Sequence, residues 1–389
     1  RVLKDGAFGY ASTNVLTAEE IDRVVDSALT IAKASPEDPA NYLPDAAEIK
    51  YIEGLVDDKN KKISLAEMLK YGQEAVSAML EHDPRVKIDS AHFGARSFER
   101  VIVNSRGIEA REEKTVFEGV CMAFAREGEL VSSFDAFLKS SCKLADTALQ
   151  KEARELADRV ISSLNAETIN SFKGSVILSP DAVLDIIVSP VFSAVNGDNV
   201  INGVSPWNGR IGDRVVSKQI SIIDNARIAG GVGSRAFDRE GVPTGETAVI
   251  TDGVLETYLH NCYTARKMEV KPTGHAGGSD RGVGISPSNF IIQPGRESLK
   301  EIIKTTSKGL LVNRFSGNVD SISGDFSGIV KGGSYIDSGE KVKPVKEIMI
   351  AGNIYQLLNN ISAISSNTKN ISAFTVPYIK LEDVSVTGK

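Results

Sequence analysis

The sequence predicts an α+β protein, with an N-terminal domain of helices packed on an antiparallel sheet and a β-rich C-terminal domain with a few short helices. Glycine is distributed unevenly, because 8 of the 34 glycines precede residue 174 and the other 26 lie from there onward. Apolar residues recur at helical spacing before that point, whereas short strand-like runs separated by glycine-rich turns follow it. A chain of 389 residues is long enough for two domains, which we place at residues 1–170 and 171–389.

The N-terminal half opens with a predicted hairpin in residues 1–10, and two helices follow it. Each helix is introduced by a Ser or Thr three residues before a Glu, a pattern typical of a capping box. The two pairs are Thr17 with Glu20 and Ser64 with Glu67. Apolar stripes then run over residues 21–32 and 65–79, which predicts one amphipathic helix in each place.

A third apolar stripe, in residues 144–164, closes this half of the chain. Strand-like runs lie between the second and third helices, at residues 92–96, 100–103, 115–125 and 130–137. Each helical stripe needs an apolar surface to cover, so we expect the helices to pack on the sheet that these strands form.

Beyond residue 174 the sequence predicts hairpins in residues 248–256 and 334–350, each with a glycine-containing turn at its centre. Helices are sparse there, and we expect them at residues 180–194, 258–268 and 354–360. Pro190 must end or kink the first of these helices, because proline lacks the backbone N–H that a helix interior requires.

Composition excludes several classes of function. The net charge is −6 and the pI is about 5.5, which disfavours binding to a nucleic-acid phosphate backbone. Cys121, Cys142 and Cys262 fit neither a disulfide framework nor a paired zinc motif, so we expect a reducing cytoplasm. No apolar run approaches the ~18–20 residues that span a bilayer, so we expect no membrane segment.

Metal chemistry lacks its usual sequence signals. The histidines are His82, His92, His260 and His275, and neither HExxH nor HExxxH occurs. His260 and Cys262 are close in sequence, but positions i and i+2 of a helix point about 200° apart. A partly buried, hydrogen-bonded His260 is therefore favoured over a ligand pair.

Other catalytic motifs are equally weak. Residues 231–236 fit the GxGxxG/A dinucleotide fingerprint, but a polar turn at 237–241 follows where a helix should begin, so a structural loop is favoured. Neither GxxxxGK[ST] nor GxSxG occurs. No serine lies in a recognised nucleophile motif with a histidine, which leaves nucleophilic catalysis without support from the sequence, although a triad can assemble in space.

Residues 272–281 form the most unusual stretch of the chain. Small residues surround His275 and precede Arg281, and they allow a backbone to approach a ligand closely. The alternative is an ordinary glycine-rich connector whose histidine is solvated, and the residues alone favour that alternative.

Several longer segments, in the same order along the chain, resemble the TldE/PmbA type of the TldD/PmbA family. They are residues 104–110 (NSRGIEA), 263–267 (YTARK), 273–278 (TGHAGG), 309–312 (GLLV), 319–328 (VDSISGDFSG) and 344–353 (PVKEIMIAGN). The resemblance covers nearly the whole chain and is more specific than any single motif. Family members usually carry a further helix and strands before the position of Arg1, so we expect the family's first N-terminal residues to be missing here.

The resemblance implies the same α+β and β-rich halves, and a dimer in which a TldD-type subunit holds zinc with a HExxxH helix and a distant cysteine. The corresponding helix of this chain contains residues 188–193 (VSPVFS), and residues 370–374 (NISAF) lack the cysteine. Apolar and hydroxyl side chains cannot replace those ligands. We therefore expect no catalytic residue, metal or other cofactor in this chain, with the zinc in a TldD-type partner.

The resemblance implies that this chain is the noncatalytic subunit of a zinc metallopeptidase that degrades or processes unstructured peptides. The chain would form one wall of a peptide-binding cavity. Extended peptides are commonly held by backbone pairing to a strand edge. The candidate lining residues are Thr273, Gly274, His275, Gly277, Gly278, Arg281 and Asn289. The expected partner is a TldD-type subunit in a heterodimer, or a second copy of this chain.

Two other functions stay open from the sequence. One is a regulatory protein that acts through protein contacts, as in the older description of the family as modulators of DNA gyrase. The other is a homodimer with a different chemistry that uses His275.

Overall fold

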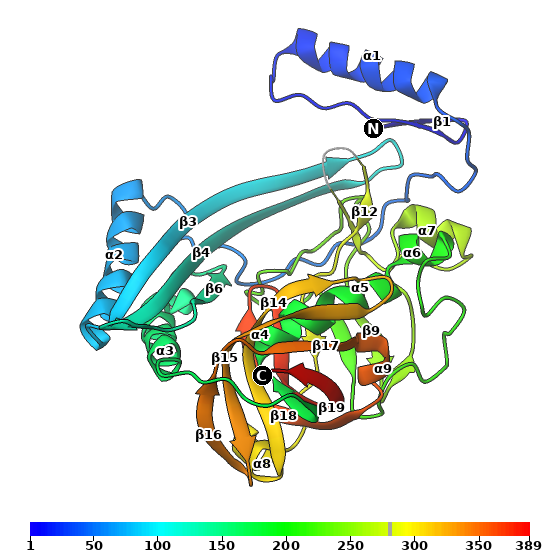
Figure 1. Cartoon of the computed structure of the whole chain (residues 1–389). Coiled ribbons are helices and arrows are strands. Elements are labelled where there is room, and N and C mark those ends of the chain that lie inside the picture. Colours follow the sequence, from blue (N-terminus) through cyan, green and yellow to red (C-terminus); the bar gives the residue numbers. More distant parts are fainter. Residues whose placement is uncertain (279–281) are drawn as a thin grey trace.

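A computed structural model of the chain describes residues 1–278 and 282–389 (Figure 1). The first elements are β1 (Val2–Lys4), β2 (Ala7–Gly9) and α1 (Ala18–Ala34). The two strands form the predicted hairpin. Thr17 Oγ1 accepts the amide of Glu20, but the reciprocal half of the predicted capping box does not form, because the Glu20 carboxylate accepts hydrogen bonds from Arg23 and Thr13 instead. The apolar stripe of α1 is only partly covered by other parts of the chain, since Ile21 and Val25 are 49% and 48% exposed. A hairpin of two three-residue strands is too narrow to cover the whole apolar face of a 17-residue helix.

A sheet backed by two helices follows. Its elements are α2 (Leu65–His82), β3 (Val86–Val103), β4 (Glu109–Glu127), β5 (Leu130–Val131), β6 (Asp135–Ser141) and α3 (Leu149–Ser162). Ser64 and Glu67 form the predicted capping box of α2. Met79, Phe137 and Leu156 share one buried core, which confirms that these helices pack on an antiparallel sheet.

Strand β3 is longer than predicted. It is one strand rather than two, and it pairs with β4 from Val86 opposite Ala125 to Val103 opposite Glu109. Much of β3 is exposed, so its middle lacks the apolar alternation by which a half-buried strand is recognised. Figure 1 shows this β3–β4 ribbon as a long arch toward the C-terminal half, where Ile108 packs with Phe237.

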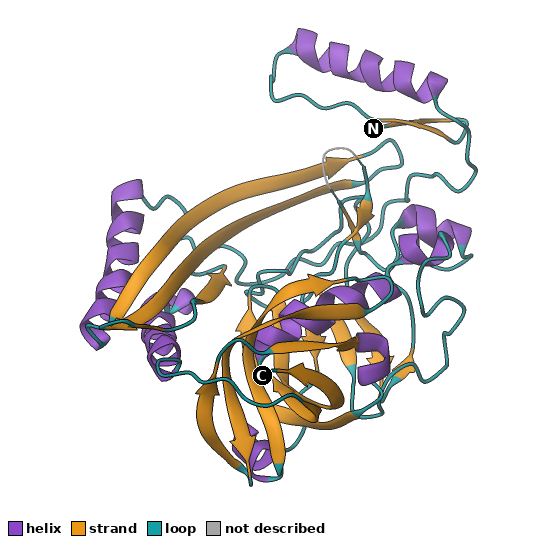
Figure 2. Cartoon of the chain, viewed as in Figure 1, coloured by secondary structure: helices purple, strands orange, loops and turns teal. Residues whose placement is uncertain are grey.

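The second half is built around one large sheet (Figure 2). Its strands are β7 (Phe172–Leu178), β8 (Ile222–Asn225), β9 (Glu246–Thr251), β10 (Val254–Leu255), β13 (Phe290–Ile292), β14 (Lys308–Val319), β15 (Asp325–Asp337), β16 (Glu340–Val345), β17 (Met349–Asn353), β18 (Ile361–Ile371) and β19 (Phe374–Thr387). Because β7 pairs with both β14 and β19, the order β19-β17-β15-β14-β7 closes into a ring. Strands β13, β8, β9 and β10 extend from β19, and the pairs β9–β10 and β15–β16 are the two predicted hairpins.

A buried helix packs with this ring. It comprises α4 (Pro180–Val183), a π-helical segment (Leu184–Val188) and α5 (Ser189–Val195). Pro190 does not end the helix; the wider π-helical turn directly before α5 accommodates the proline that an α-helical interior would not. Ile186 and Val191 of this helix belong to the same core as Val312 of β14.

The remaining elements are short. They are α6 (Gly197–Ile201), α7 (Cys262–Lys267), β11 (Ala276–Gly277), β12 (Gly284–Ile285), α8 (Leu299–Lys304) and α9 (Ile354–Leu357). Helix α7 begins later than predicted, because Asn261 caps it by accepting a hydrogen bond from the amide of Thr264, 2.8 Å away. His260 therefore precedes the helix. Within the described residues no helix is both long and apolar enough to cross a membrane. The predicted α+β class, with its β-rich C-terminal half, is confirmed.

Candidate functional site

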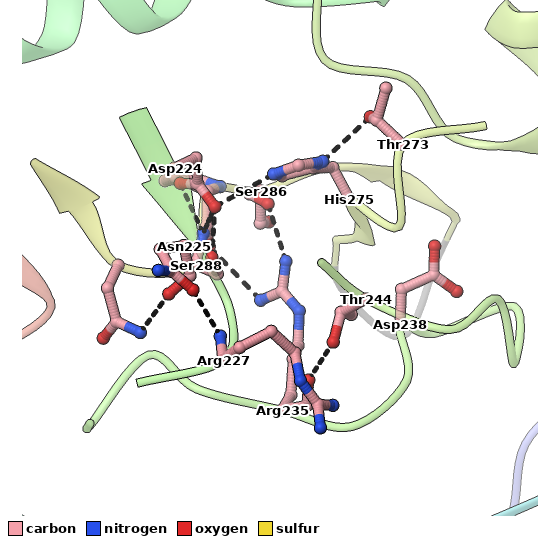
Figure 3. Close-up of polar contacts among 12 residues, drawn as sticks. Asp224, Asn225, Arg227, Arg235, Asp238, Thr244, Thr273, His275, Ser286 and Ser288 are labelled. Carbon is pink, nitrogen blue, oxygen red and sulfur yellow. Dashed lines mark hydrogen bonds and ion pairs between the residues drawn. The ribbon is translucent and has the colours of Figure 1, made fainter. Parts of the chain in front are cut away.

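His275 lies in a chain of hydrogen bonds between β8 and the segment that leads into β11 (Figure 3). Its Nε2 is 3.0 Å from Asp224 Oδ1, and its Nδ1 is 2.8 Å from Thr273 Oγ1. The side chains of His275 and Asp224 are only 2% and 0% exposed. The alternative interpretation of a solvated histidine is therefore wrong, since both ring nitrogens have partners inside the protein. We call Asp224, His275 and Thr273 the buried relay.

The hydroxyl of Thr273 is fully engaged in this relay. It accepts a hydrogen bond from the amide of His260, 2.7 Å away, and donates one to the carbonyl oxygen of the same residue at 3.1 Å. Because this hydroxyl bonds both the amide and the carbonyl oxygen of His260, it is not free to attack a substrate. The relay thus fixes the path of the chain before β11.

Asp224 is the charged end of the relay. Burial alone would raise its pKa, but hydrogen bonds from His275 and Ser288 outweigh burial and lower the pKa below the ordinary value of 3.8. The amide of Ser288 donates to Asp224 Oδ2 at 2.8 Å, and its hydroxyl donates to Oδ1. These donors compensate the buried carboxylate for the water it has lost.

Asp238 is a second buried carboxylate, in the loop between β8 and β9. Its Oδ2 accepts the amide of Ala276 at 3.0 Å, and its Oδ1 accepts the amides of Glu240 and Val242 at 2.8 and 3.0 Å. Burial, followed by the nearby charge of Glu240, raises the pKa of Asp238 to about 6 although the amides act in the opposite direction. Asp238 thereby anchors the backbone of β11 to this loop.

A cleft of about 810 Å³ opens in front of β11. Its lining includes Arg1, Arg100, Arg235, Arg239, Gly277 and Gly278. Arg239 Nη1 donates to the carbonyl oxygen of Gly278 at 2.9 Å, so a guanidinium group is held beside the glycine strand. The volume falls within the ~300–1,000 Å³ typical of ligand sites. We call this the arginine cleft.

The β3–β4 ribbon forms the opposite wall of the arginine cleft. Arg100 Nη2 on β3 donates to the carbonyl oxygen of Phe237 at 2.6 Å and to Glu112 Oε1 on β4 at 3.2 Å. Lys114 Nζ on β4 donates to the carbonyl oxygen of Ser234 at 2.7 Å. Side chains from both strands therefore hold the 232–238 loop in place.

The structure separates the predicted lining residues into two groups. Gly277 and Gly278 line the arginine cleft, whereas Thr273 and His275 lie behind β11 in the buried relay. Gly274 has a φ of +75° and sits in the turn between them.

Asn289 is buried and accepts the amide of Gly233 at 2.9 Å through its Oδ1. Arg281 lies outside the described residues. The role of all seven residues in substrate binding stays a prediction.

Several residues of the site were missed by sequence reasoning, namely Arg100, Glu112, Asp224, Arg235, Asp238 and Arg239. Arg235 lies within the fingerprint-like stretch 231–236, which was interpreted as a structural loop, and Asp238 lies in the polar turn after it. An arginine and an aspartate so close to a glycine-rich loop were the available signal. Arg100 and Asp224 have no recognisable signal in the sequence, because only tertiary folding brings them to the site.

The residues that correspond to a family zinc helix do not fit a metal. Residues 188–193 contain no imidazole, carboxylate or thiolate, and Val188 and Val191 are buried in the core. Residues 370–374 comprise the end of β18, a two-residue turn and the start of β19, and they contain no cysteine. In the described part of the chain, no three His, Cys, Asp or Glu side chains are grouped so as to hold a metal ion.

His260 also has the environment of a structural residue. Its Nδ1 is 3.1 Å from Thr264 Oγ1, and burial, followed by the charge of His275, lowers its pKa to about 4. The predicted hydrogen bonding of His260 is confirmed, and at 2% exposed the residue is more deeply buried than the partial burial that the sequence predicts.

Comparison with known families gives matches along most of the chain. Residues 171–388 match the PmbA/TldA metallopeptidase C-terminal domain, residues 58–164 the central domain and residues 1–32 domain 1. A metalloprotease PmbA homolog of Buchnera aphidicola is 27% identical over 387 residues, which are 98% of this chain and 84% of that protein. A second PmbA homolog, from Haemophilus influenzae, is 26% identical over 391 residues, with 98% and 83% covered.

Two solved structures share the fold. One, from Thermotoga maritima and described as a modulator of a DNA gyrase, aligns with a TM-score of 0.89 at 28% identity and covers 99% of this chain and 87% of that one. The other, TldE from Thermococcus kodakarensis, aligns with a TM-score of 0.88 at 22% identity, with 99% and 88% covered, and shows the fold alone.

These domain matches define a metallopeptidase-type protein, built here from a β-rich ring, a long ribbon and a buried helix. The chain belongs to the PmbA/TldA metallopeptidase family, which confirms the resemblance to TldD/PmbA proteins.

Proposed function

We propose that this chain is the noncatalytic, TldE-type subunit of a zinc metallopeptidase and forms one wall of the cavity that holds an unstructured peptide. The observation that carries the proposal is the helix over residues 180–195. Its segment 188–193 offers no metal ligand, although the family is one of metallopeptidases. A TldD-type partner would supply the zinc and the hydrolytic step.

The arginine cleft supports the peptide-binding part of the proposal. Gly277 and Gly278 line the arginine cleft with backbone atoms alone, so a ligand backbone can approach theirs closely. Asp238 fixes the adjacent residue, Ala276, from behind, and a preorganised wall loses less entropy when it binds a flexible peptide.

The test is to measure zinc content and peptide hydrolysis for the purified chain, for a TldD-type partner and for the two combined. The chain alone should carry substoichiometric zinc and cleave no unstructured peptide. The combined sample should turn peptides over faster than the partner alone. Stoichiometric zinc in the isolated chain, or chelator-sensitive hydrolysis by it, would contradict the proposal.

A second candidate is a regulator that acts through protein contacts. It is favoured by the description of the Thermotoga maritima structure as a modulator of a DNA gyrase. Affinity capture from the native host distinguishes the two. Recovery of a protein with a HExxxH motif supports the subunit role, and recovery of gyrase subunits without such a protein supports the regulator.

A further inference from the structure

Three guanidinium groups of the arginine cleft have hydrogen-bonding capacity to spare. A guanidinium carries five N–H donors. Among the described residues, Arg239 donates to one carbonyl oxygen, that of Gly278, and Arg235 donates to two, those of Ser286 and Pro287, at 2.9 and 3.2 Å. The Nε atoms of Arg100 and Arg235 are buried and have no hydrogen-bond partner in the described structure.

The acidic side chains near these arginines are already engaged by backbone amides. Glu112 pairs with Arg100, but its Oε2 accepts the amide of Ala236 at 2.5 Å. Glu240 Oε2 accepts the amide of Cys262 at 2.7 Å, and Asp238 accepts the amides of Ala276, Glu240 and Val242. Burial lowers the pKa of Arg100 and Arg235, with nearby carboxylates only partly opposing it. Among the described residues that line the cleft, four are arginines and one, Glu240, is acidic, so the described lining carries more positive than negative charge.

Apolar side chains in the lining narrow the class of ligand that the cleft could bind. Val101 and Val103 of β3 line the cleft and are 54% and 67% exposed. Leu43 and Pro44 add further apolar surface. An anion that also offers apolar groups suits these walls better than a bare phosphate does, and a peptide with a carboxylate has both features.

We propose that the arginine cleft binds a carboxylate of an extended peptide, with Arg239 and Arg100 as its ligands and Arg235 as a supporting charge. The carboxylate is either the peptide's C-terminus or an acidic side chain, since both present the planar pair of oxygens that matches a guanidinium fork. The inference deepens the proposed function by naming the substrate class, but it concerns binding to this chain alone.

The experiment measures binding of labelled peptides to the full chain by fluorescence anisotropy. Four peptides share one apolar sequence and an N-terminal dye: a free C-terminal acid, its amide, and two amides with an internal Glu or Gln. We expect the free acid or the Glu peptide to bind about tenfold more tightly than its neutral counterpart, because charge-assisted hydrogen bonds are the strong ones. A gain for the free acid identifies the C-terminal carboxylate as the bound group, and a gain for the Glu peptide identifies an acidic side chain.

Matched arginine variants locate the site. Arg239→Gln should raise the dissociation constant of the acidic peptide about tenfold and leave that of the neutral peptide unchanged, and Arg239→Lys should fall between. Arg96→Gln is the control, since Arg96 lies on β3, is 67% exposed and pairs with Glu118 outside the cleft lining. Thermal melts of each variant show whether it is folded.

Three results would overturn the proposal. They are equal affinity for acidic and neutral peptides, an equal loss of affinity in Arg96→Gln, and displacement of the acidic peptide by inorganic phosphate at lower concentrations than by an acetylated dipeptide acid. Because binding is measured without a partner, these results leave the zinc and hydrolysis test of the subunit role unaffected.

Discussion

The buried helix over residues 180–195 and the wall behind the arginine cleft bury opposite kinds of side chain. In the helix the buried side chains are mostly apolar, as at Ile186, Val191 and Val195. Behind the cleft, Asp224, Asp238 and His275 are each at most 2% exposed. Burying a charged group costs free energy unless it is paired, so polar residues persist in a core only where a network satisfies them. In this chain the paired polar groups shape β11 and the cleft, and the helix serves packing.

The largest expected effect is at the charged end of the relay. Asp224→Ala removes the partner of His275 and of two Ser288 donors, so we expect a loss of about 3–5 kcal/mol in the free energy of unfolding, measured with urea. Asp213→Ala, at a pair whose carboxylate is 61% exposed, should cost less than about 1 kcal/mol. A similar small loss for both variants would show that the relay is not a stabilising network.

The helix should respond through packing alone. Ile186→Ala leaves a cavity in the main core, so we expect a loss of about 2–4 kcal/mol in the free energy of unfolding. Ile322→Ala, at a side chain that is 42% exposed, should cost less than about 1 kcal/mol. Peptide affinity measured by anisotropy should be unchanged in the folded Ile186→Ala protein. A specific loss of affinity would instead couple the helix to the cleft and break the comparison.

Asp238 predicts a pH dependence that the apolar helix cannot produce. Its folded-state pKa of about 6 lies above the ordinary 3.8, so the folded state binds more protons between these values. The stabilisation is complete below about pH 4 and is lost as pH rises through 6. We expect the stability of the wild type relative to Asp238→Asn to fall by on the order of 2–3 kcal/mol from pH 4 to pH 7.

Urea unfolding of both proteins at pH 4, 5.5 and 7 measures this difference. Titrations shared by the two proteins cancel in the comparison. A difference that rises with pH would mean that the amides of Ala276 and Val242 outweigh burial and that the carboxylate is charged throughout.

The elements that sequence reasoning recovered are those with local causes. The capping box at Ser64 and Glu67 and the turn at residues 251–253 are set by neighbours in the chain, and both formed as predicted. The sequence pattern predicts two strands where the structure has the single strand β3. A strand that is exposed along much of its length shows no sustained alternation of apolar and polar residues.

The candidate site depended on contacts that no local pattern encodes. His275 stood out by its glycine neighbours, but Asp224 lies 51 residues away and Arg100 reaches the loop at Phe237 across 137 residues. Such pairs depend on the pairing of β8 with β13 and on the packing of the β3–β4 ribbon against the C-terminal half. Sequence reasoning could therefore identify the stretch at residues 273–278 but neither the burial of its histidine nor the arginines facing it.

The smallest expected effect distinguishes the cleft wall from an ordinary connector. Gly278 has a φ of +99°, and an added Cβ would lie 2.6 Å from the amide nitrogen of Gly284, so Gly278→Ala should cost about 1–2 kcal/mol in unfolding free energy. Gly245→Ala is the matched control, because nothing lies within 4 Å of its added Cβ. If the wall contacts peptides, Gly278→Ala should also weaken peptide binding in the anisotropy assay while Gly245→Ala does not. Destabilisation without any change in affinity would assign Gly278 to the turn alone and move the contact surface toward the β3–β4 ribbon.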